Sequence, residues 1–353
     1  MSRIDTLWKN CRSEIDAFLI CSQQNRYYLS NFTGSSGCIL VSAEHRFLLT
    51  DSRYREQAAL ESPEFEVKIG KRFYDEVSEL ARTRGWNRIG FEAEHMTVQD
   101  YLQLLQRYPD VQWLPMTGIV ERQRGIKDKK EIEYLRQAAQ IADQALSLAW
   151  DHLRPGVSER QFQLILEHAM ENLGSQGISF PTIVASGPRG SMPHAKPTDR
   201  VFKEDDWVTI DFGAVDHGYH SDETVTIPVT KKALSGQLAV IYDIVLQAQN
   251  AGIKALKPGV SASQVDEIVR GVIIEAGYSE YFGHGTGHGV GLDVHEAPLL
   301  GPSSPKDMTL EAGMVVTIEP GIYLPQVGGV RLEDMLLVTA EGSTRLTSWD
   351  KES

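Results

Sequence analysis

The sequence predicts two domains: a small α/β domain over residues 1–120, then an α+β domain over residues 121–353 whose two halves resemble each other. Three observations support this prediction. Helix-like and strand-like segments alternate up to about residue 118, a charged, turn-like interval follows at residues 121–130, and the remaining sequence contains an internal repeat. A chain of 353 residues is long enough for each domain to bury its own core.

The first domain is expected to alternate helices with strands. Hydrophobic periodicity predicts helices over residues 4–18, 72–84 and 97–108, and short β-branched or aromatic runs predict strands over residues 37–41, 46–50, 65–69, 88–91 and 111–114. This order of elements is typical of a small α/β domain.

The second domain is expected to begin with a long amphipathic helix over residues 129–152, after which a pattern repeats. Residues 153–161 read L-R-P-G-V-S-E-R-Q, and residues 256–264 read L-K-P-G-V-S-A-S-Q. In each copy a turn leads to a serine, Ser158 or Ser261, that can cap the helix after it. The repeat predicts two α+β halves related by an approximate two-fold axis, and a two-copy solenoid is the simpler alternative.

The first half contains a predicted β-hairpin over residues 207–226, which read W-V-T-I-D-F-G-A-V-D-H-G-Y-H-S-D-E-T-V-T. A turn centred between Asp216 and His217 would place Asp211 directly opposite Asp222, with their Cβ atoms about 4.5–5.5 Å apart. Two like charges at that distance in a half-buried sheet would raise the pKa of one carboxyl group sharply. A divalent cation between them would remove the repulsion.

The second half repeats this hairpin. The sequence T-I-D-F-G at residues 209–213 is echoed by T-I-E-P-G at residues 317–321. A loop around Gln326 would fold Glu333 back beside Glu319, because both are equally distant from Gln326 in the sequence. Four carboxylates are therefore predicted to converge, and a fold alone does not require them.

A segment rich in glycine and histidine lies between the hairpins, where residues 282–296 read F-G-H-G-T-G-H-G-V-G-L-D-V-H-E. It does not fit the dinucleotide-binding pattern G-x-G-x-x-G, because Val290 occupies the last glycine position and no βαβ unit surrounds it. Glycines also allow the backbone to approach a buried site closely. Three histidines beside four acids, His284, His288 and His295, favour a functional site over isolated structural histidines.

The composition, with 41% hydrophobic and 24% charged residues, is that of a soluble globular protein. The net charge of −13 argues against nucleic acid or an anionic membrane as a partner, and no apolar run is long enough to span a membrane. The N-terminus lacks the apolar core of a signal peptide, and the three cysteines show no disulfide or zinc-site spacing. We therefore expect a cytoplasmic protein.

Several motifs resemble those of a known family. V-T-I-D-F-G followed by S-D-E-T, G-T-G-H-G-V-G-L-D-V-H-E-A-P, T-I-E-P-G-I-Y and G-G-V-R-L-E-D resemble the pita-bread metallopeptidases of family M24. N-F-T-G-S-S-G, L-L-T-D-S-R-Y and R-G-I-K-D-K-K-E-I resemble the creatinase-like N-terminal domain and linker of its aminopeptidase P and prolidase branch. The resemblance covers almost the whole chain. It implies a pita-bread fold for the second domain and a creatinase-like α/β fold for the first.

By this resemblance, two divalent metal ions are bound, with Mn²⁺ favoured and Co²⁺, Fe²⁺ or Zn²⁺ as alternatives. The implied ligands are Asp211 on one ion, His288 and Glu319 on the other, and Asp222 and Glu333 between them. Arg331 lies two residues before Glu333 and therefore on the same face of its strand. It is expected to hold the bridging carboxylates in place, and Thr224 is expected to support the ligands as well.

The resemblance also implies an activity, which is hydrolysis of Xaa-Pro bonds at peptide N-termini by a hydroxide activated between the two ions. The implied catalytic side chains are His194, His284, His295 and Glu319. His295 would stabilise the oxyanion, and Glu319 would carry a proton toward the leaving nitrogen. The other two histidines would orient a proline-containing peptide, and a homodimer is expected by kinship.

One departure from the family pattern bears on specificity. Leu299 stands where many prolidases carry a basic residue that is expected to meet the carboxylate of a dipeptide. This favours an Xaa-Pro aminopeptidase acting on longer peptides, with an Xaa-Pro dipeptidase (prolidase) as the alternative. A metal-free creatinase-like hydrolase and a non-enzymatic peptide-binding paralogue are disfavoured, because both usually lose ligands that this chain keeps.

Overall fold

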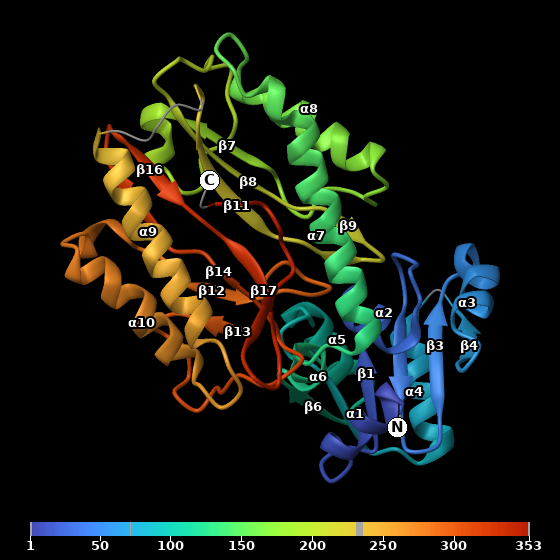
Figure 1. Ribbon diagram of the computed structural model, residues 1–353. Coiled ribbons are helices and arrows are strands. Elements are labelled where there is room, and N and C mark those ends of the chain that lie inside the picture. The colour runs from blue at the N-terminus through green and yellow to red at the C-terminus, as the bar shows by residue number, and fades with distance from the viewer. Residues whose placement is uncertain (1, 71, 231–235, 352–353) are drawn as a thin grey trace. The chain divides into compact units, whose positions relative to one another are not determined.

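The N-terminal unit of the computed structural model, Met1–Arg124, is built on one six-stranded sheet (Figure 1). Its strands are β1 (Ala17–Ile20), β2 (Cys38–Val41), β3 (Arg46–Thr50), β4 (Glu66–Ile69), β5 (Arg88–Glu92) and β6 (Gln112–Met116), in the order β4-β3-β2-β1-β5-β6. The structure describes residues 2–70, 72–230 and 236–351. The five strands predicted for this unit are confirmed as β2 to β6.

One helix prediction in this unit was wrong at its C-terminal end. The helices are α1 (Arg3–Cys11), α2 (Gln23–Ser30), α3 (Arg55–Glu61), α4 (Phe73–Arg84), α5 (Val98–Arg107) and α6 (Ile119–Gly125). The helix expected over residues 4–18 stops at Cys11, and the next apolar run forms β1, which pairs with both β2 and β5. A central strand is buried on both faces, so its short apolar run cannot be distinguished from a helix segment by periodicity.

The described residues of the C-terminal unit, Gly125–Ser353, form two main sheets and two short hairpins. The first sheet has the order β11-β8-β7, and the second has the order β13-β12-β14-β17-β18. The hairpins pair β9 with β10 and β15 with β16. The strands are β7 (Ile183–Ser186), β8 (Trp207–Phe212), β9 (Val215–Asp216), β10 (Tyr219–His220), β11 (Glu223–Pro228), β12 (Gly287–Gly289), β13 (Glu296–Leu300), β14 (Val315–Ile318), β15 (Gly321–Leu324), β16 (Gly328–Arg331), β17 (Asp334–Val338) and β18 (Ser343–Arg345).

Two pairs of helices cover these sheets, as the repeat predicted. The helices are α7 (Lys129–Ala149), α8 (Glu159–Asn172), α9 (Gly236–Ala255) and α10 (Ala262–Glu275). The side chains of Ser158 and Ser261 cap α8 and α10. The first helix pair shares a buried apolar core with β7, β8 and β11, and the second shares one with β14 and β17 (Figure 1). Each half therefore combines a helix pair with a sheet.

The two halves meet where β11 approaches β16 and the start of β17. Glu333 donates its backbone N–H to the carbonyl oxygen of Thr224 at 3.0 Å, and Thr226 donates its hydroxyl to the carbonyl oxygen of Arg331 at 2.9 Å. These contacts bring the two acidic hairpins side by side. The internal duplication thus places one acidic hairpin from each half at a shared seam.

The register predicted for the first hairpin was wrong by two residues. Asp211 pairs with Thr224 rather than with Asp222, and Asp216 pairs with Tyr219. The turn is therefore centred on His217 and Gly218, whose φ angles of 49° and 76° are both positive, as a two-residue type I′ turn requires. Glycine meets this requirement at the second position without steric cost.

The register of the second hairpin is confirmed. Ile318 pairs with Asp334, and Gly321 pairs with Arg331, so every pair is symmetric about Gln326. Glu319 and Glu333 lie between these pairs, at the point where β14 gives way to β15 and β16 gives way to β17.

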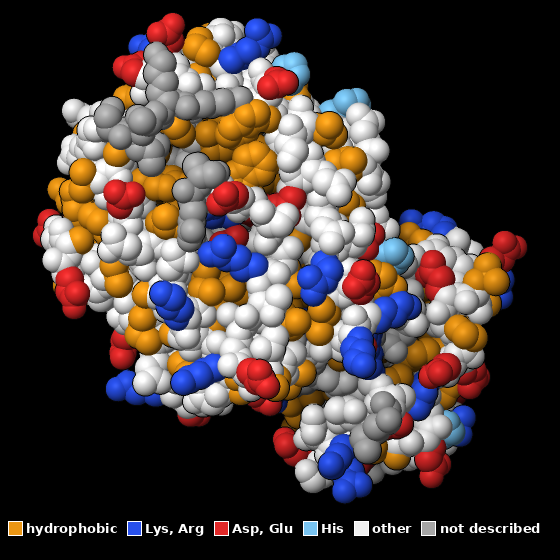
Figure 2. Space-filling view, viewed as in Figure 1, with side chains coloured by type: hydrophobic (Ala, Val, Ile, Leu, Met, Phe, Trp, Pro, Cys, Tyr) orange, Lys and Arg blue, Asp and Glu red, His pale blue; other side chains and the backbone are white. Residues whose placement is uncertain are grey.

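No helix of the part of the chain that the structure describes is long and apolar enough to cross a membrane. Figure 2 shows acidic and basic side chains interspersed on the viewed face of each unit.

Candidate metal centre

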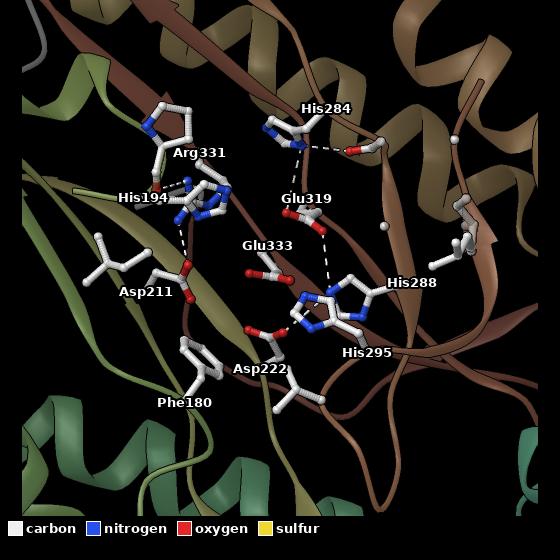
Figure 3. Close-up of a pocket in the computed structure, with 18 of the residues that line it drawn as sticks. Phe180, His194, Asp211, Asp222, His284, His288, His295, Glu319, Arg331 and Glu333 are labelled. Atoms are coloured by element: carbon white, nitrogen blue, oxygen red, sulfur yellow. Dashed lines mark hydrogen bonds and ion pairs between the residues drawn. The ribbon is translucent and has the colours of Figure 1, made fainter. Parts of the chain in front are cut away.

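A cavity of about 1090 Å³ opens in the C-terminal unit, between its two halves. It is lined by all five side chains that the sequence predicted as ligands, by the three predicted catalytic histidines, and by Arg331. Figure 3 shows the carboxylates of Asp211, Asp222, Glu319 and Glu333 pointing into the same space. Thr224 is fully buried and does not line the cavity.

Asp222, His288 and Glu333 form the tightest group of possible ligands. One ligand atom from each lies within 4.8 Å of the other two, and all three residues are buried. Asp222 directly precedes β11, Glu333 directly precedes β17, and His288 is the central residue of β12. Three strands of two sheets therefore deliver these side chains to one point.

The imidazole of His288 is neutral and presents its Nε2 lone pair to acids. Burial is the main reason that its pKa falls to about 4. Its Nδ1 lies 3.0 Å from the carbonyl oxygen of Gly289 and can only donate there, so Nε2 carries no proton. Nε2 is 3.5 Å from carboxylate oxygens of both Asp222 and Glu319. A lone pair facing two carboxylates is unfavourable unless a cation or a proton lies between them.

Burial also affects the carboxyl groups. It raises the pKa of Glu319 to about 8, and it raises the pKa of Asp222 well above its ordinary value, with further contributions from the charges of Glu333 and Asp211. The pKa of Glu333 rises well above its usual range for the same main reason, followed by the charge of Glu319. The sequence predicted that close acids would perturb one another in this way. Burial, however, is the largest cause.

Arg331 binds Asp211 directly, whereas the sequence predicted that it would hold the bridging carboxylates of Asp222 and Glu333. Its Nη2 donates to Oδ2 of Asp211 at 2.5 Å, and its Nε donates to the hydroxyl of Thr224 at 3.1 Å. The Thr224 hydroxyl in turn donates to Oε2 of Glu333 at 2.7 Å. Arg331 thus contacts Asp211 directly and reaches Glu333 only through Thr224. The cause is the two-residue shift in register, which places Thr224 opposite Asp211.

The three remaining histidines occupy different parts of the cavity wall. His284 lies 2.8 Å from the Gly285 carbonyl through Nδ1 and 2.8 Å from the Tyr323 hydroxyl through Nε2. Burial lowers the pKa of His284 to about 4, so the ring is neutral. The rings of His288 and His295 have centroids 4.2 Å apart. His194 is exposed on the segment that precedes β8, next to Pro193, whose carbonyl accepts a hydrogen bond from Arg331.

Comparison with known proteins identifies the family. Residues 133–340 match metallopeptidase family M24, and residues 3–126 match the creatinase/prolidase N-terminal domain. The chain belongs to metallopeptidase family M24. The predicted fold, a pita-bread domain preceded by a creatinase-like α/β domain, is confirmed, and the protein is a metallopeptidase.

Three relatives of this M24 chain match it over nearly their whole length. It is 40% identical over 339 residues to the uncharacterized peptidase YqhT of Bacillus subtilis, covering 96% of this chain and 95% of that one. A solved structure titled Xaa-Pro dipeptidase, from Bacillus anthracis, is 41% identical with a TM-score of 0.95, covering 99% and 98% of the two chains. The X-Pro aminopeptidase structure from Thermotoga maritima is 35% identical with a TM-score of 0.89, covering 96% and 97%.

The side chains of this M24 site fit a divalent cation. Oδ1 of Asp211 is buried and has no hydrogen-bond partner in the part of the chain that the structure describes, which is costly for a carboxylate oxygen unless another group satisfies it. Four carboxylates that face one cavity and one neutral imidazole form a set of hard oxygen donors with a single nitrogen, which suits Mn²⁺ and related ions. The tight group of Asp222, His288 and Glu333 supplies three donor atoms at one point. A divalent metal is therefore the natural partner of this arrangement.

Sequence reasoning missed part of the M24 cavity wall. Phe180 and Thr182 line the cavity just before β7, and Figure 3 shows the Phe180 ring below Asp211. The hydroxyl of Thr182 is buried and has no hydrogen-bond partner among the described residues. The apolar run I-V-A-S that forms β7 was a usable signal, because a strand paired with β8 carries the residues before it to the same site.

Proposed function

We propose that the protein is an Xaa-Pro exopeptidase that uses two divalent metal ions, Mn²⁺ in the first instance, to hydrolyse the bond before proline at peptide N-termini. The observation that carries this proposal is the convergence of four carboxylates, two buried and two largely buried, and a neutral imidazole on a cavity of about 1090 Å³. The ligands would be the five residues predicted from the sequence.

The charges of the site support two ions rather than one. Four carboxylates and one guanidinium, that of Arg331, give a net charge of −3 when all are ionised, because the histidine ligand is neutral. One divalent ion would leave −1 buried, whereas two would leave +1, which an anionic nucleophile would neutralise. When bound, such ions supply a water-derived nucleophile at neutral pH and polarise the scissile carbonyl.

We assign the roles of the surrounding side chains by their positions. His295 is exposed to the cavity beside His288 and can donate a hydrogen bond to the oxyanion that develops on the substrate. Glu319 points into the same space and would carry a proton from the nucleophile to the leaving nitrogen. His194 and His284 border the cavity and would orient the peptide.

The cavity favours a peptide longer than a dipeptide. Its volume of about 1090 Å³ lies above the range of about 300–1,000 Å³ that is typical of small-molecule sites. Leu299 borders it, is 60% exposed and offers no charge to a dipeptide carboxylate. An Xaa-Pro dipeptidase is the second candidate, because the similar structure from Bacillus anthracis, with a TM-score of 0.95, is named an Xaa-Pro dipeptidase.

The test compares hydrolysis of an Xaa-Pro-Yaa tripeptide with that of an Xaa-Pro dipeptide, before and after chelator treatment and Mn²⁺ addition. We expect metal-dependent cleavage with a higher kcat/KM for the tripeptide. His288→Ala should abolish cleavage. His168→Ala, which changes an exposed histidine on α8, is the control and should leave cleavage unchanged. Activity that survives chelation and the His288→Ala change would exclude the proposal, and a strong preference for the dipeptide would select the second candidate.

We also propose that the protein is a homodimer, as its kinship with the aminopeptidase P and prolidase branch implies. We further propose that it works in a reducing compartment such as the cytoplasm. The three cysteines, Cys11, Cys21 and Cys38, are unpaired thiols, which is usual where disulfides do not persist. Sedimentation of the purified protein tests the dimer.

A further inference from the structure

The C-terminal segment carries a buried lysine that touches both halves of the C-terminal unit. The Nζ of Lys351 lies 2.8 Å from Oε1 of Glu223 and 2.8 Å from Oδ1 of Asp334. The side chains of the three residues are 3%, 0% and 1% exposed. Glu223 belongs to β11 of the first sheet, and Asp334 belongs to β17 of the second. One ammonium group therefore joins the two sheets.

The two acids that Lys351 joins are the chain neighbours of two candidate metal ligands. Glu223 follows Asp222, and Asp334 follows Glu333. Successive side chains of a strand point to opposite faces. Asp222 and Glu333 face the cavity, so their neighbours face away from it, where Lys351 lies. The lysine thus ties the two strands together directly behind the pair proposed to bridge both ions.

The segment around Lys351 is itself fixed to helices of both halves. Ser348 donates its N–H and its hydroxyl to Oδ2 of Asp143 on α7, at 2.9 and 2.8 Å. Tyr242 on α9 donates its hydroxyl to the carbonyl oxygen of Lys351 at 2.8 Å. The segment that carries the ammonium group is therefore held in place by contacts other than those with Glu223 and Asp334.

We propose that Lys351 is a positioning residue that sets the separation of Asp222 and Glu333 and thereby the affinity of the metal centre. The proposal rests on the function proposed above. Without the ammonium, two fully buried carboxylates would face each other across the seam between the sheets with no shared cation. Their repulsion would move β11 and β17 apart, together with the ligand that precedes each strand.

If the positive charge of Lys351 is removed, electrostatics and positioning predict opposite changes in the affinity for a divalent cation. The proposal can therefore be tested. By Coulomb attraction alone, removing a positive charge near the site would make it bind a divalent cation more tightly. Loss of positioning would make it bind more weakly, as removal of residues that orient ligands typically lowers metal affinity about 10- to 100-fold. The direction of the change therefore separates the two effects.

The experiment measures the Mn²⁺ affinity of chelator-treated wild type and Lys351→Met by calorimetric titration, with the melting temperature of each metal-free protein. The matched control is Gln249→Leu. Gln249 on α9 donates to Oδ2 of Asp334 at 3.0 Å, which is a buried contact with the same acid but within one half. We expect both variants to melt at a lower temperature than wild type. Lys351→Met should bind Mn²⁺ at least 10-fold more weakly than wild type, whereas the Mn²⁺ affinity of Gln249→Leu should stay within about 3-fold of the wild-type value. Lys351→Arg, which keeps a charge able to reach both acids, should recover most of the affinity.

Lys351→Met with unchanged or tighter Mn²⁺ binding would overturn the inference, as would an equal loss of affinity in Gln249→Leu. If Lys351→Met does not fold, Lys351→Gln takes its place under the same expectations, because its amide can reach one acid but cannot span both. A wild-type protein that neither binds Mn²⁺ nor cleaves Xaa-Pro peptides would refute the proposed function instead, so the two failures are distinguishable.

Discussion

The metal-free protein should become less stable as the pH rises through the neutral range, and Glu319 should be a main cause. The carboxyl group has an ordinary pKa of 4.5, and burial raises it to about 8 in the folded protein. Between these values the folded protein keeps a proton that the unfolded chain has released, so raising the pH favours unfolding. The stabilisation is complete below about pH 4.5 and is lost as the pH passes 8.

The size of the effect follows from linkage. Each pH unit contributes about 1.4 kcal/mol, so the interval from 4.5 to about 8 corresponds to at most about 5 kcal/mol of unfolding free energy. The part that falls between pH 5 and pH 8 is about 3–4 kcal/mol. For a domain of this size it corresponds to roughly 10 °C in melting temperature.

Glu319→Gln isolates this contribution, since glutamine has a similar size and does not ionise. Urea unfolding of chelator-treated wild type and variant at pH 5, 6, 7 and 8 gives the difference in unfolding free energy at each pH. We expect the variant to gain about 3–4 kcal/mol relative to wild type between pH 5 and pH 8. Mn²⁺ should restore the wild type at pH 8 and help the variant much less. A difference that does not change with pH would refute the argument.

Three further substitutions test the support of the site and of its hairpin. Arg331→Met breaks a buried ion pair with a ligand carboxylate and should lower the free energy of unfolding by about 3–5 kcal/mol in urea titrations; a loss below about 1 kcal/mol would contradict the pairing. Thr224→Val removes a buried hydroxyl that serves two partners and should cost about 1–3 kcal/mol by the same assay, with roughly 10-fold weaker Mn²⁺ binding by titration. Gly213→Ala would push a methyl group into the Ser221 carbonyl and should lower the melting temperature, whereas Gly271→Ala, in open space on α10, should leave it equal or higher.

The sequence was most informative where a local rule determines the structure. The serine caps of α8 and α10, the internal repeat and the symmetric loop at Gln326 are set by residues close to one another in the chain, and all were predicted. The partner of Arg331 could not be predicted in this way. Its strand face was correct, but its long side chain chooses between Asp211 and Glu333 according to the register of another hairpin.

β1 shows the same limit in the N-terminal unit. Its four residues are buried on both faces between β2 and β5, and only this long-range pairing makes them a strand. Taken with residues 4–11, the run fits a helical period just as well. Local pattern therefore identified the elements that carry a cap or a turn signal, and it failed for an element defined by its neighbours alone.

The register of the first hairpin differs from the predicted register by two residues, and the size of this shift explains why the predicted site residues still converge. A shift of one residue would have moved every side chain to the opposite face of the sheet, whereas a shift of two keeps each side chain on its own face. Asp211 therefore still points into the cavity, although it faces Thr224 instead of Asp222. The shift also has a chemical consequence. Two opposed aspartates would have had no donor between them, but in the actual register a threonine hydroxyl lies opposite Asp211 and links Arg331 to Glu333. The turn at His217 and Gly218 determines this register, so a feature well outside the cavity decides which residues support the metal ligands.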